Sequence, residues 1–480
     1  MYRSFFCLFF FIWMTSCSVG PPYVPPSVEV PSEWKNKQEE ACQSKDLNEN
    51  DPFCCLDYWW QIFNDSKLEE LEALAMEKNR DLLVAFERTQ EARALKGIAA
   101  SNFYPQIALN PLTTNTMELI KNYVNKNSVN GINGSVGIPF RVHEMLYYLP
   151  VNMSYEVDLW GKIRDKYQSA NYDWLAQKKD YEAIMLSLTS NLAITYYQLR
   201  AADTQIELLK QTVKTREKAL EINQARYEEE ITFYADVTLA AEEVEIVQAQ
   251  YEETLRQRKV LENLIAVLIG MPASEFSIEH APLRSIPPCI PEGIPSEVLL
   301  RRPDIVEAEY RIRSEHALVK NAYSQFFPSL TLTAAGGFQS PIFKDFLSSM
   351  SRYWMDSVQI NQLIFDGGAI YYNLRLQTER FRQASGSYQQ QVLTAFQEVE
   401  NALVDLDSYA KQYEIALRTS QWAQKTNQLY LDRYQLGVTY YINVANTERD
   451  WLNYEVNVNL MLGYRYIATI QLIQALGGGW

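Results

Sequence analysis

Two stretches of the chain, 161–230 and 368–436, contain no proline and carry apolar residues at every seventh position. A seven-residue period is typical of helices that pack as left-handed coiled coils, and a four-residue step in that period locally unwinds the supercoil. The pattern therefore predicts two long coiled-coil helices, each on the order of 100 Å in length. The repeating positions are Tyr167, Trp174, Tyr181, Leu188, Leu192, Leu199, Ile206, Val213, Leu220 and Tyr227, with the step after Leu188, and later Val399, Leu406 and Tyr413 with Ala402, Tyr409 and Ala416.

Each long helix is expected to reach a turn, at 228–236 and at 435–443, and to be followed by a shorter helix. The shorter helices are expected over about 236–269 and 443–475. The chain thus contains two predicted helical hairpins, 161–270 and 368–476.

Shorter stretches before the hairpins alternate between apolar and polar residues, as the two faces of a β-strand do. The segments VNMSYEVDL (151–159) and WMDSVQINQLI (354–364) show this alternation, and 106–114 and 329–339 show it more weakly. We therefore expect two strand pairs, within 104–160 and 328–365. Alternation over about ten residues fits a transmembrane β-strand, and it also fits a soluble sheet with one solvated face.

The two halves of the chain resemble each other. At a shift of 223 residues, 81–109 aligns with 304–332, and at a shift of 207 residues, 226–237 aligns with 433–444. Self-similarity in the same order indicates a tandem duplication. The expected repeats are 59–295, which ends in a linker at 271–295, and 296–480. Each has a helix (about 64–102 and 296–325) that stops at Phe-aromatic-Pro, because proline cannot continue a helix, and then a strand pair and a hairpin.

The N-terminus reads as a processing signal. Residues 1–16 have Arg3 before an apolar run that is too short to span a bilayer as a helix, as in a signal peptide. Met14-Thr15-Ser16-Cys17 matches a lipobox, which predicts acylation of Cys17; an ordinary signal peptide with a chance cysteine is the alternative. Residues 17–58 would form a lipid-anchored extension, beginning as an extended, Pro-rich spacer. No later segment has 18 consecutive apolar residues, so no transmembrane helix is expected.

Composition argues against several functions. The chain has 59 acidic and 44 basic residues and a net charge of −15, whereas nucleic-acid binding needs a basic face. The three histidines lack metal-ligand spacing, no GxxxxGK[ST] loop occurs, and no Ser/His/Asp constellation stands out. We expect no enzyme activity, no cofactor and no metal site.

An exported compartment permits disulfides, but pairing stays open for four cysteines: Cys42, Cys54, Cys55 and Cys289.

A set of motifs spread over nearly all of the mature chain carries a family resemblance. Together and in this order they resemble the TolC-like outer-membrane factors, in the lipoprotein branch that serves tripartite (RND-type) efflux systems. The motifs are Trp59-Trp60 with Phe63, Asn79-x-Asp81-Leu82, SYEVDLWG (154–161), Arg301-Arg302-Pro303-Asp304, Phe326-Phe327-Pro328, Phe365-Asp366-Gly367-Gly368 and Leu476-Gly477-Gly478-Gly479-Trp480.

The resemblance implies a mainly α fold with a transmembrane β-barrel. Three subunits would form a homotrimer in which each donates four strands to one barrel of about 12 strands, while the long helices form a periplasmic α-barrel. Pairing across subunits would remove the open sheet edges. Ser18, which follows the acylated cysteine and is not aspartate, resembles a signal for sorting to the outer membrane of a Gram-negative bacterium.

The resemblance also implies a passive exit duct that works with a periplasmic adaptor (membrane fusion) protein and an inner-membrane efflux transporter. The lipobox and the terminal LGGGW are most similar to drug-type, proton-driven systems, and eleven methionines without Met-x-x-Met clusters give no reason to prefer copper or silver. The alternatives are the outer-membrane channel of a type I secretion system and a lipid-anchored helical tether. A tether leaves the strand pairs and the duplication unexplained.

Two groups of site residues follow from the strand pattern and the family's turn motif. The apolar strand positions are expected to face lipid, the alternative being the core of a soluble sheet: Val151, Met153, Tyr155, Val157, Trp354, Val358 and Ile360. The RY-x-x-G motif marks the periplasmic tip and adaptor contact in the family, and its matches are Arg226, Tyr227, Arg433, Tyr434 and Gly437. Glu230 stands where the first turn would have glycine, so that turn is expected to be less tight; alternatively, Tyr227 and Tyr434 simply end their apolar stripes.

The pore constriction is the last expected site. Family members often narrow the channel with a ring of inward carboxylates just past the tip glycine. The matching positions here are Asn443 and Asn446 beside Ile442, with Asp236 in the first half, so one anionic ring of three carboxylates would remain. The alternative is that the two asparagines only contact neighbouring helices.

Overall fold

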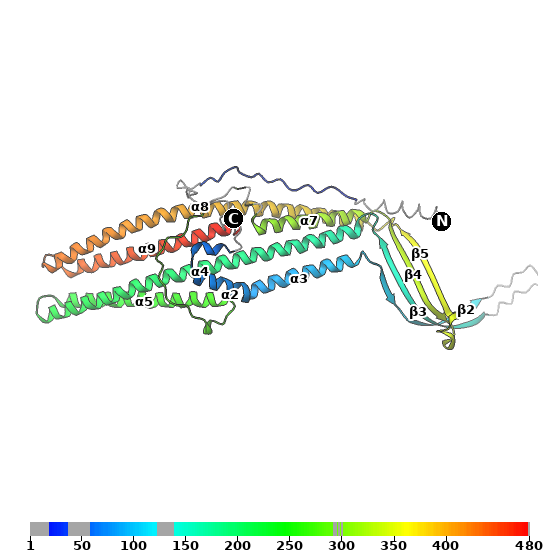
Figure 1. The fold of residues 1–480 in the computed structure, drawn as a ribbon, viewed down its shortest axis with the longest axis horizontal. Coiled ribbons are helices and arrows are strands. Elements are labelled where there is room, and N and C mark those ends of the chain that lie inside the picture. Colours follow the sequence, from blue (N-terminus) through cyan, green and yellow to red (C-terminus); the bar gives the residue numbers. More distant parts are fainter. Residues whose placement is uncertain are drawn as a thin grey trace, which may run out of the picture. The chain divides into compact units, whose positions relative to one another are not determined.

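The computed structural model describes residues 19–36, 58–121, 139–290, 295, 298 and 301–478, and Figure 1 shows its helices and strands. The chain divides into two compact units. The sheet unit comprises the described parts of Met1–Val24, Ala92–Asp173 and Ile312–Gln383, and the helical unit those of Pro25–Glu91, Trp174–Arg311 and Ala384–Trp480. Each unit draws on both sequence repeats.

The hairpins show the duplication over their full length. The two long helices have 67 residues each and the two return helices 35 each, and every bound in the second half lies 207 positions after its counterpart. The helices are α4 (Lys162–Glu228), α5 (Tyr234–Leu268), α8 (Ala369–Gln435) and α9 (Tyr441–Ala475). The shift of 207, first seen over twelve residues, therefore holds without insertion through both hairpins.

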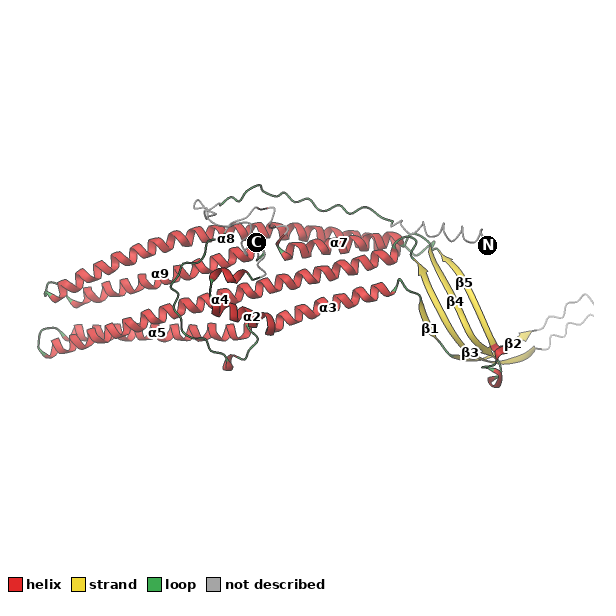
Figure 2. Ribbon diagram, in the orientation of Figure 1, coloured by secondary structure: helices red, strands yellow, loops and turns green. Residues whose placement is uncertain are grey.

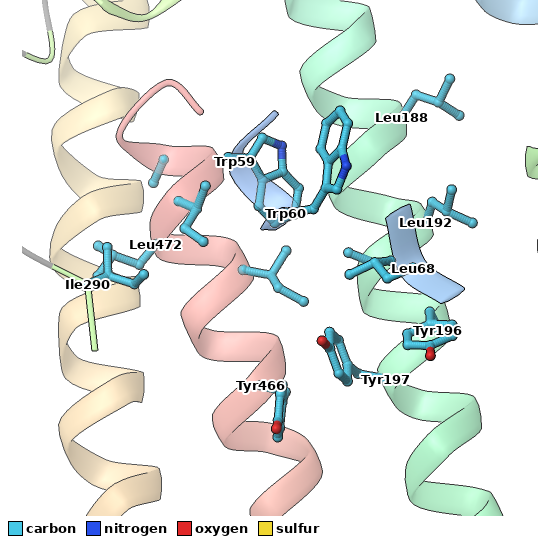
Figure 3. Close-up of a cluster of buried hydrophobic side chains, with 14 of the residues drawn as sticks. Trp59, Trp60, Leu68, Leu188, Leu192, Tyr196, Tyr197, Ile290, Tyr466 and Leu472 are labelled. Atoms are coloured by element: carbon cyan, nitrogen blue, oxygen red, sulfur yellow. The ribbon is translucent and has the colours of Figure 1, made fainter. Parts of the chain in front are cut away.

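The predicted apolar stripes form the core of the helical unit. Leu188, Leu192 and Leu199 of α4 are buried, as are Val399 and Ala402 of α8. Figure 3 shows this core, in which a short 3-10 helix (Trp59–Phe63) packs against α4 and α9. This explains the first motif: both tryptophans are buried, and the Trp59 indole donates a hydrogen bond to Thr189 Oγ1 at 3.2 Å.

The expectation of one helix over 64–102 is wrong. The chain forms α2 (Ser66–Lys78) and α3 (Arg80–Ser101), which are separated by Asn79 in an extended conformation. Asn79 Oδ1 accepts a hydrogen bond from the Leu82 amide at 2.9 Å, which caps α3, and Asn79 Nδ2 donates to the Leu268 carbonyl at the end of α5 at 2.8 Å. The side chain therefore fixes both helix ends.

The second repeat uses Arg302 at the matching position. Its Nη1 donates to the Ala475 carbonyl at the end of α9 at 3.1 Å, and its Nε and Nη2 bind the carboxylate of Asp304. Burial alone would raise the pKa of Asp304, but the hydrogen bonds and charge of Arg302 outweigh it and hold the pKa below its usual value. The expectation of one helix over about 296–325 is also wrong: residues 295, 298 and 301 are helical, the helix breaks at Arg302, and α7 (Pro303–Ser324) begins next with proline in its first turn.

The strands form one antiparallel sheet, coloured yellow in Figure 2. β1 and β2 both pair with β3, and β3, β4 and β5 follow in order. A break at Asn110-Pro111 separates β1 from β2, because proline cannot donate to the ladder. The strands are β1 (Gln106–Leu109), β2 (Leu112–Lys121), β3 (Pro139–Val157), β4 (Ser329–Ser340) and β5 (Arg352–Asn361), and further short 3-10 helices lie at Ala273–Glu275, Phe343–Asp345 and Ser349–Ser351. The four predicted stretches are confirmed as strands, but the stretch 106–114 is divided between β1 and β2, and the strand that contains 151–157 begins already at Pro139.

Part of the N-terminal extension packs on the helical unit, although the sequence suggests only a spacer. Trp34 is buried edge-on against Phe396 of α8, and the Lys35 amide donates to Glu400 Oε1 at 2.7 Å. Val28 packs near the start of α7 and on α8, against Ile305. Segment 25–36 therefore contributes to the helical core.

Candidate functional site at the hairpin turns

Both hairpins turn through the same hydrogen-bonded motif. In the first, the Ile231 amide donates to the Arg226 carbonyl at 2.8 Å and the Glu230 amide to the Tyr227 carbonyl at 3.0 Å; in the second, Val438 and Gly437 make the same pair of bonds at 2.9 and 3.0 Å. These are Schellman motifs, whose penultimate residue adopts the left-handed conformation. Glu230 has φ +56° and Gly437 φ +71°. The expected loosening at Glu230 is wrong, because the two bonds hold glutamate in a conformation that glycine adopts without strain.

Asp236 and Asn443 occupy equivalent positions in the first turn of α5 and α9. The Thr232 hydroxyl donates to the Asp236 carboxylate, and Asn443 Nδ2 donates to Thr439 Oγ1 at 2.9 Å. A carboxylate near a helix N-terminus is favoured by the helix dipole. Both side chains are half-buried and fasten the turn to the return helix. Ile442, next to Asn443, is exposed.

Asn446 has a cationic neighbour that the sequence analysis missed. Arg449, one turn further along α9, donates from Nη2 to Asn446 Oδ1 at 2.8 Å, and its Nη1 lies 3.5 Å from Glu243 Oε1 of α5. The i, i+3 spacing of Asn446 and Arg449 is the signal that could have identified the pair. The guanidinium is about half-exposed, so any surface that Asn446 lines carries this charge too.

Tyr434 joins the two hairpins. Its hydroxyl donates to Asn223 Oδ1 of α4 at 2.9 Å, and the Arg226 guanidinium lies 4.7 Å from its ring centroid. Burial raises the pKa of Tyr434, and the nearby charge of Arg226 acts in the opposite direction. Around this contact, Ala240 of α5 and Ala445 of α9 belong to one buried apolar cluster.

The other predicted tip residues do not join the hairpins within one chain. Tyr227 is 45% exposed and its ring lies against Tyr234, which is 62% exposed. Arg433 lies over the ring of Tyr430 in its own helix, 5.7 Å from the centroid. Tyr441, the counterpart of Tyr234, is only 3% exposed. The two halves of the tip are thus equivalent in backbone and unequal in burial.

The sheet register places all seven predicted lipid-facing residues on one face. Directly paired residues share a face in an antiparallel sheet. Tyr155 pairs with Leu332, which pairs with Val358, and the neighbouring rows join Val157 to Ile360 and Val151 to Trp354 through β4; Met153 lies on the same face between Val151 and Tyr155. Trp354 is 82% exposed. The opposite face carries rows of polar residues, such as Glu156, Thr331 and Gln359.

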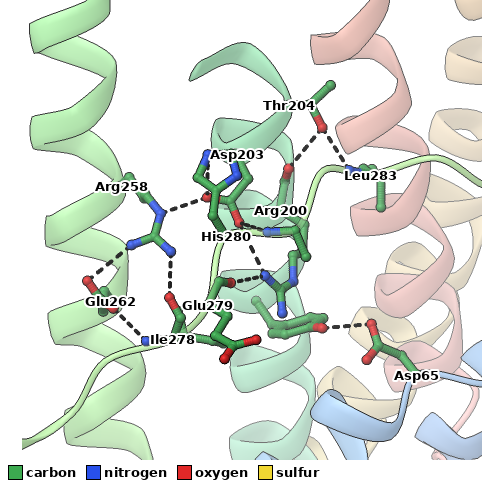
Figure 4. Close-up of polar contacts among 12 residues, drawn as sticks. Asp65, Arg200, Asp203, Thr204, Arg258, Glu262, Ile278, Glu279, His280 and Leu283 are labelled. Atoms are coloured by element: carbon green, nitrogen blue, oxygen red, sulfur yellow. Dashed lines mark hydrogen bonds and ion pairs between the residues drawn. The ribbon is translucent and has the colours of Figure 1, made fainter. Parts of the chain in front are cut away.

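A buried ionic network fixes the linker after α5, and the sequence analysis missed it. Asp203 of α4 is fully buried and accepts hydrogen bonds from Arg258 Nε at 2.6 Å, Arg200 Nη1 at 3.2 Å and the Ala281 amide at 3.0 Å (Figure 4). The two arginines also donate to the carbonyls of Ile278 and Glu279, each at 2.7 Å. The network joins α4, α5 and the linker.

The remaining predictions concern the cysteines, a metal site and a transmembrane helix. Cys17, Cys42, Cys54 and Cys55 are outside the described residues, while Cys289 is disulfide-bonded. Within the described ranges, no three His, Cys, Asp or Glu side chains gather as metal ligands would. No helix in the described part of the chain is both long and apolar enough to cross a membrane.

The fold defines a class of protein. Duplicated helical hairpins are joined in one chain to an antiparallel sheet with one exposed apolar face, and solved outer-membrane channels share this fold. The chain belongs to the outer membrane efflux protein family, whose model matches residues 71–271 and 294–478.

Individual relatives agree with this assignment. The chain is 27% identical to the probable outer membrane lipoprotein SilC of Salmonella typhimurium, over 98% of this chain and 97% of that protein. It is 26% identical to the antibiotic efflux pump outer membrane protein ArpC of Pseudomonas putida, over 97% and 93%. The solved CmeC outer membrane channel of Campylobacter jejuni matches with a TM-score of 0.83 at 26% identity, over 97% and 95%. The predicted family, fold class and location in the outer membrane of a Gram-negative bacterium are confirmed: the protein is an efflux channel and not an enzyme.

Proposed function

We propose that three copies of this chain form the exit duct of a tripartite pump, with a periplasmic adaptor and an inner-membrane transporter as partners. The open sheet is the observation that supports the trimer. Among the described strands, β1 and β2 pair with β3 alone and β5 pairs with β4 alone, so both edges offer free backbone groups. Such groups need partners in a bilayer, and pairing with neighbouring subunits would close a barrel of about 12 strands.

The unequal tips support the same assembly. Within one chain, Tyr434 of the second hairpin packs against the first hairpin, whereas the matching Tyr227 is exposed. In a ring of alternating hairpins, the second hairpin of a neighbouring subunit would cover Tyr227. The same neighbouring hairpin would cover the exposed Tyr234, in the way that the first hairpin covers Tyr441 within one chain.

The turns themselves are the proposed contact for the adaptor. Their exposed apolar side chains are Ile231, Phe233, Leu436, Val438 and Tyr440. Apolar side chains gathered on an exposed surface are typical of a protein interaction site. Arg226, Tyr227, Arg433, Tyr434 and Gly437 would shape this end of the duct.

Replacing residues 229–233 and 436–440 by Gly-Ser linkers of equal length tests this function. The trimer is expected to persist, because the core and the sheet are untouched, while efflux is lost because the adaptor surface is removed. The measurement is the resistance of a deletion strain to antibiotics, detergents and metals, with and without the variant, alongside trimer detection on a gel. Full resistance with the swapped turns would contradict the adaptor contact.

We also propose that Cys17 is acylated and tethers the N-terminus to the inner leaflet of the outer membrane. The lipobox supports this, as does the description of SilC as a lipoprotein. Several acyl chains give durable anchoring where one chain gives little. The Cys17→Ser variant is expected to lose labelling by radioactive palmitate, and persistent labelling would refute the assignment.

The proposed constriction combines Asp236, Ile442, Asn443 and Asn446. Three Asp236 carboxylates would favour cations, and divalent cations would bridge like charges held close together. Asparagine binds cations poorly by comparison, and Arg449 beside Asn446 weakens the anionic field further. We therefore expect cation selectivity with only weak magnesium block.

Substituting Asn446 tests that proposal in planar bilayers. Asn446→Asp is expected to strengthen magnesium block modestly, because the new carboxylate pairs with Arg449. The double variant N446D/R449Q is expected to strengthen it further, since the ring then carries unpaired carboxylates. Unchanged conductance and block in both variants would show that Asn446 does not line the pore.

A further inference from the structure

The loop between β4 and β5, residues 341–351, lies at the end of the sheet away from the helices, because β4 follows α7 and β5 precedes α8 (Figure 2). Four apolar side chains of this loop are 56–95% exposed: Ile342, Phe343, Leu347 and Met350. They take no part in the proposed tip or constriction. Because water solvates such a cluster poorly, it indicates a surface that meets a partner.

Two aromatic rings show on which side of the sheet the loop lies. The rings of Phe343 and Phe346 pack against Tyr147 of β3, with centroids 5.2 and 6.0 Å from that of Tyr147. Tyr147 shares its face of the sheet with Val151, because side chains an even number of positions apart along a strand point the same way. The loop therefore packs on the apolar face, which is the proposed lipid side, and not on the polar face, which would line the lumen.

Tyr147 lies where the apolar face ends. In its own row of the sheet it is flanked by Thr113 and Ser340. In the next row towards the helices, Arg352 of β5 joins the row of Leu149 through β4. Tyrosine and arginine at the end of an apolar band are typical of the boundary between hydrocarbon and headgroups. The loop thus lies at the level where the outer leaflet of the membrane would be.

The loop pairs polar groups within itself. The Ser340 hydroxyl donates to the Ile342 carbonyl at 2.8 Å, and the Ser351 hydroxyl donates to the Asp345 carbonyl at 2.6 Å. The Ser348 amide donates to the same Asp345 carbonyl at 3.1 Å. Backbone groups that already have partners enter apolar surroundings at a smaller cost. Polar groups paired inside the loop and apolar side chains exposed on it suit contact with lipid better than contact with water.

The charges at the loop complement a membrane surface. Lys344 is exposed beside Phe343, and Arg352 is exposed at the start of β5. Asp345 is the one carboxylate among residues 341–352, whereas the whole chain has a net charge of −15. Basic side chains next to exposed apolar ones bind anionic headgroups, while the apolar side chains enter the acyl region.

We infer that this loop inserts into the outer leaflet of the outer membrane. Phe343, Leu347 and Met350 enter the acyl chains, and Lys344 and Arg352 bind lipid phosphates. The inference rests on the proposed barrel, whose lipid-facing side the loop extends. The loop fixes the depth of the strand ends in the membrane, at the leaflet opposite to the proposed lipid anchor.

Fluorescence quenching of labelled protein tests this. A fluorescent amino acid, introduced by amber suppression, replaces Met350, Val358 or Gln339 in three separate variants, each folded into vesicles of phosphatidylcholine and phosphatidylglycerol. Met350 is 95% exposed, so the label there disturbs little packing. Val358 lies on the proposed lipid-facing side, and Gln339, which pairs with Tyr148, lies on the polar face.

Brominated acyl chains quench a label in hydrocarbon, and iodide quenches a label in water. Brominated lipid is expected to lower the emission at position 350 about as much as at position 358, and iodide is expected to have little effect at either. The label at position 339 is expected to respond in the opposite way.

The three labels distinguish failure of the loop contact from failure of the barrel. Absence of quenching by brominated lipid at position 358 would overturn the barrel and, with it, this inference. Brominated-lipid quenching at 358 together with iodide quenching at 350 would leave the barrel and overturn the inference, as for a loop that covers the lumen. Quenching by neither agent at 350 would overturn it as well, since a neighbouring subunit would then cover the loop.

A second arm tests the two cations. With the label at position 350, K344Q/R352Q is expected to weaken quenching by brominated lipid in vesicles that contain phosphatidylglycerol, and to match the parent in vesicles of phosphatidylcholine alone. Arg256→Gln, in an exposed pair with Glu253 on α5, is the control and is expected to change neither value. Equal quenching of K344Q/R352Q and the parent in the anionic vesicles would overturn the contact with lipid phosphates.

Discussion

Replacing Asp203 by alanine is expected to lower the free energy of unfolding by about 3–5 kcal/mol, because it leaves buried charges without their partner. The carboxylate compensates Arg200 and Arg258, whose side chains are 7% and 12% exposed. It also accepts the Ala281 amide, so the linker loses a fixed point together with the two arginines.

The measurement is denaturant unfolding of the purified protein in detergent, compared with the parent. Arg256→Gln serves as the control, since Arg256 pairs with Glu253 at the surface and solvent screens that pair. Asp203→Asn is the closer comparison, because it keeps the side-chain volume and removes only the charge. Stability losses no larger than that of the control would show that the network does not hold the linker.

The fold could be predicted in detail where the sequence repeats itself. The apolar stripe of α4 keeps a seven-residue period on both sides of the four-residue step from Leu188 to Leu192, and this period predicts the long helix. Proline marked the end of the helices before each strand pair. The strands were harder to assign, because the alternation at Val151–Val157 is equally compatible with a soluble sheet. The strand register of the structure shows which residues share a face: Tyr155, Leu332 and Val358 lie in one row.

What escaped prediction depends on residues that meet only in the folded chain. Asp203, Arg258 and the carbonyl of Ile278 come from three segments, so no local spacing marks them. Arg216 of α4 and Glu448 of α9 form an ion pair at 3.0 Å, yet they are far apart in the sequence and look like ordinary charged helix residues. The break at Asn79 was missed although asparagine is a preferred N-cap residue, which is the local signal that could have found it. Its second contact, to the Leu268 carbonyl, is distant in sequence.

The tip residues illustrate the limit of reasoning by analogy between repeats. Arg226 and Arg433 match in sequence, yet Arg226 lies over Tyr434 of the other hairpin and Arg433 over Tyr430 of its own helix. The two turns therefore have equivalent backbones but different side-chain contacts. Arg226 lies on the side of the first hairpin that meets the second hairpin of the same chain, whereas Arg433 lies against its own helix. A repeat in the sequence does not show which of two equivalent side chains is buried, so it could not predict this difference in contacts.

Arginine at position 358 is expected to destabilise the membrane-inserted protein by about 2–4 kcal/mol, the cost of a cation on the lipid-facing side of a barrel near the bilayer midplane. Val358 is 68% exposed on the apolar face, beside Leu332. Gln359, the next residue, lies on the opposite face beside Thr331, in the row that contains Glu156. Gln359→Arg would place its charge on a polar surface and is expected to cost little.

The two variants form a matched pair, because the same side chain enters adjacent positions of one strand. Folding into lipid vesicles followed by urea unfolding measures both. If the sheet closes into a barrel around water, only Val358→Arg moves a charge from solvent into hydrocarbon, and the difference between the variants reports that transfer. Equal tolerance at the two positions would instead mean that both faces meet the same surroundings, and it would count decisively against a transmembrane barrel.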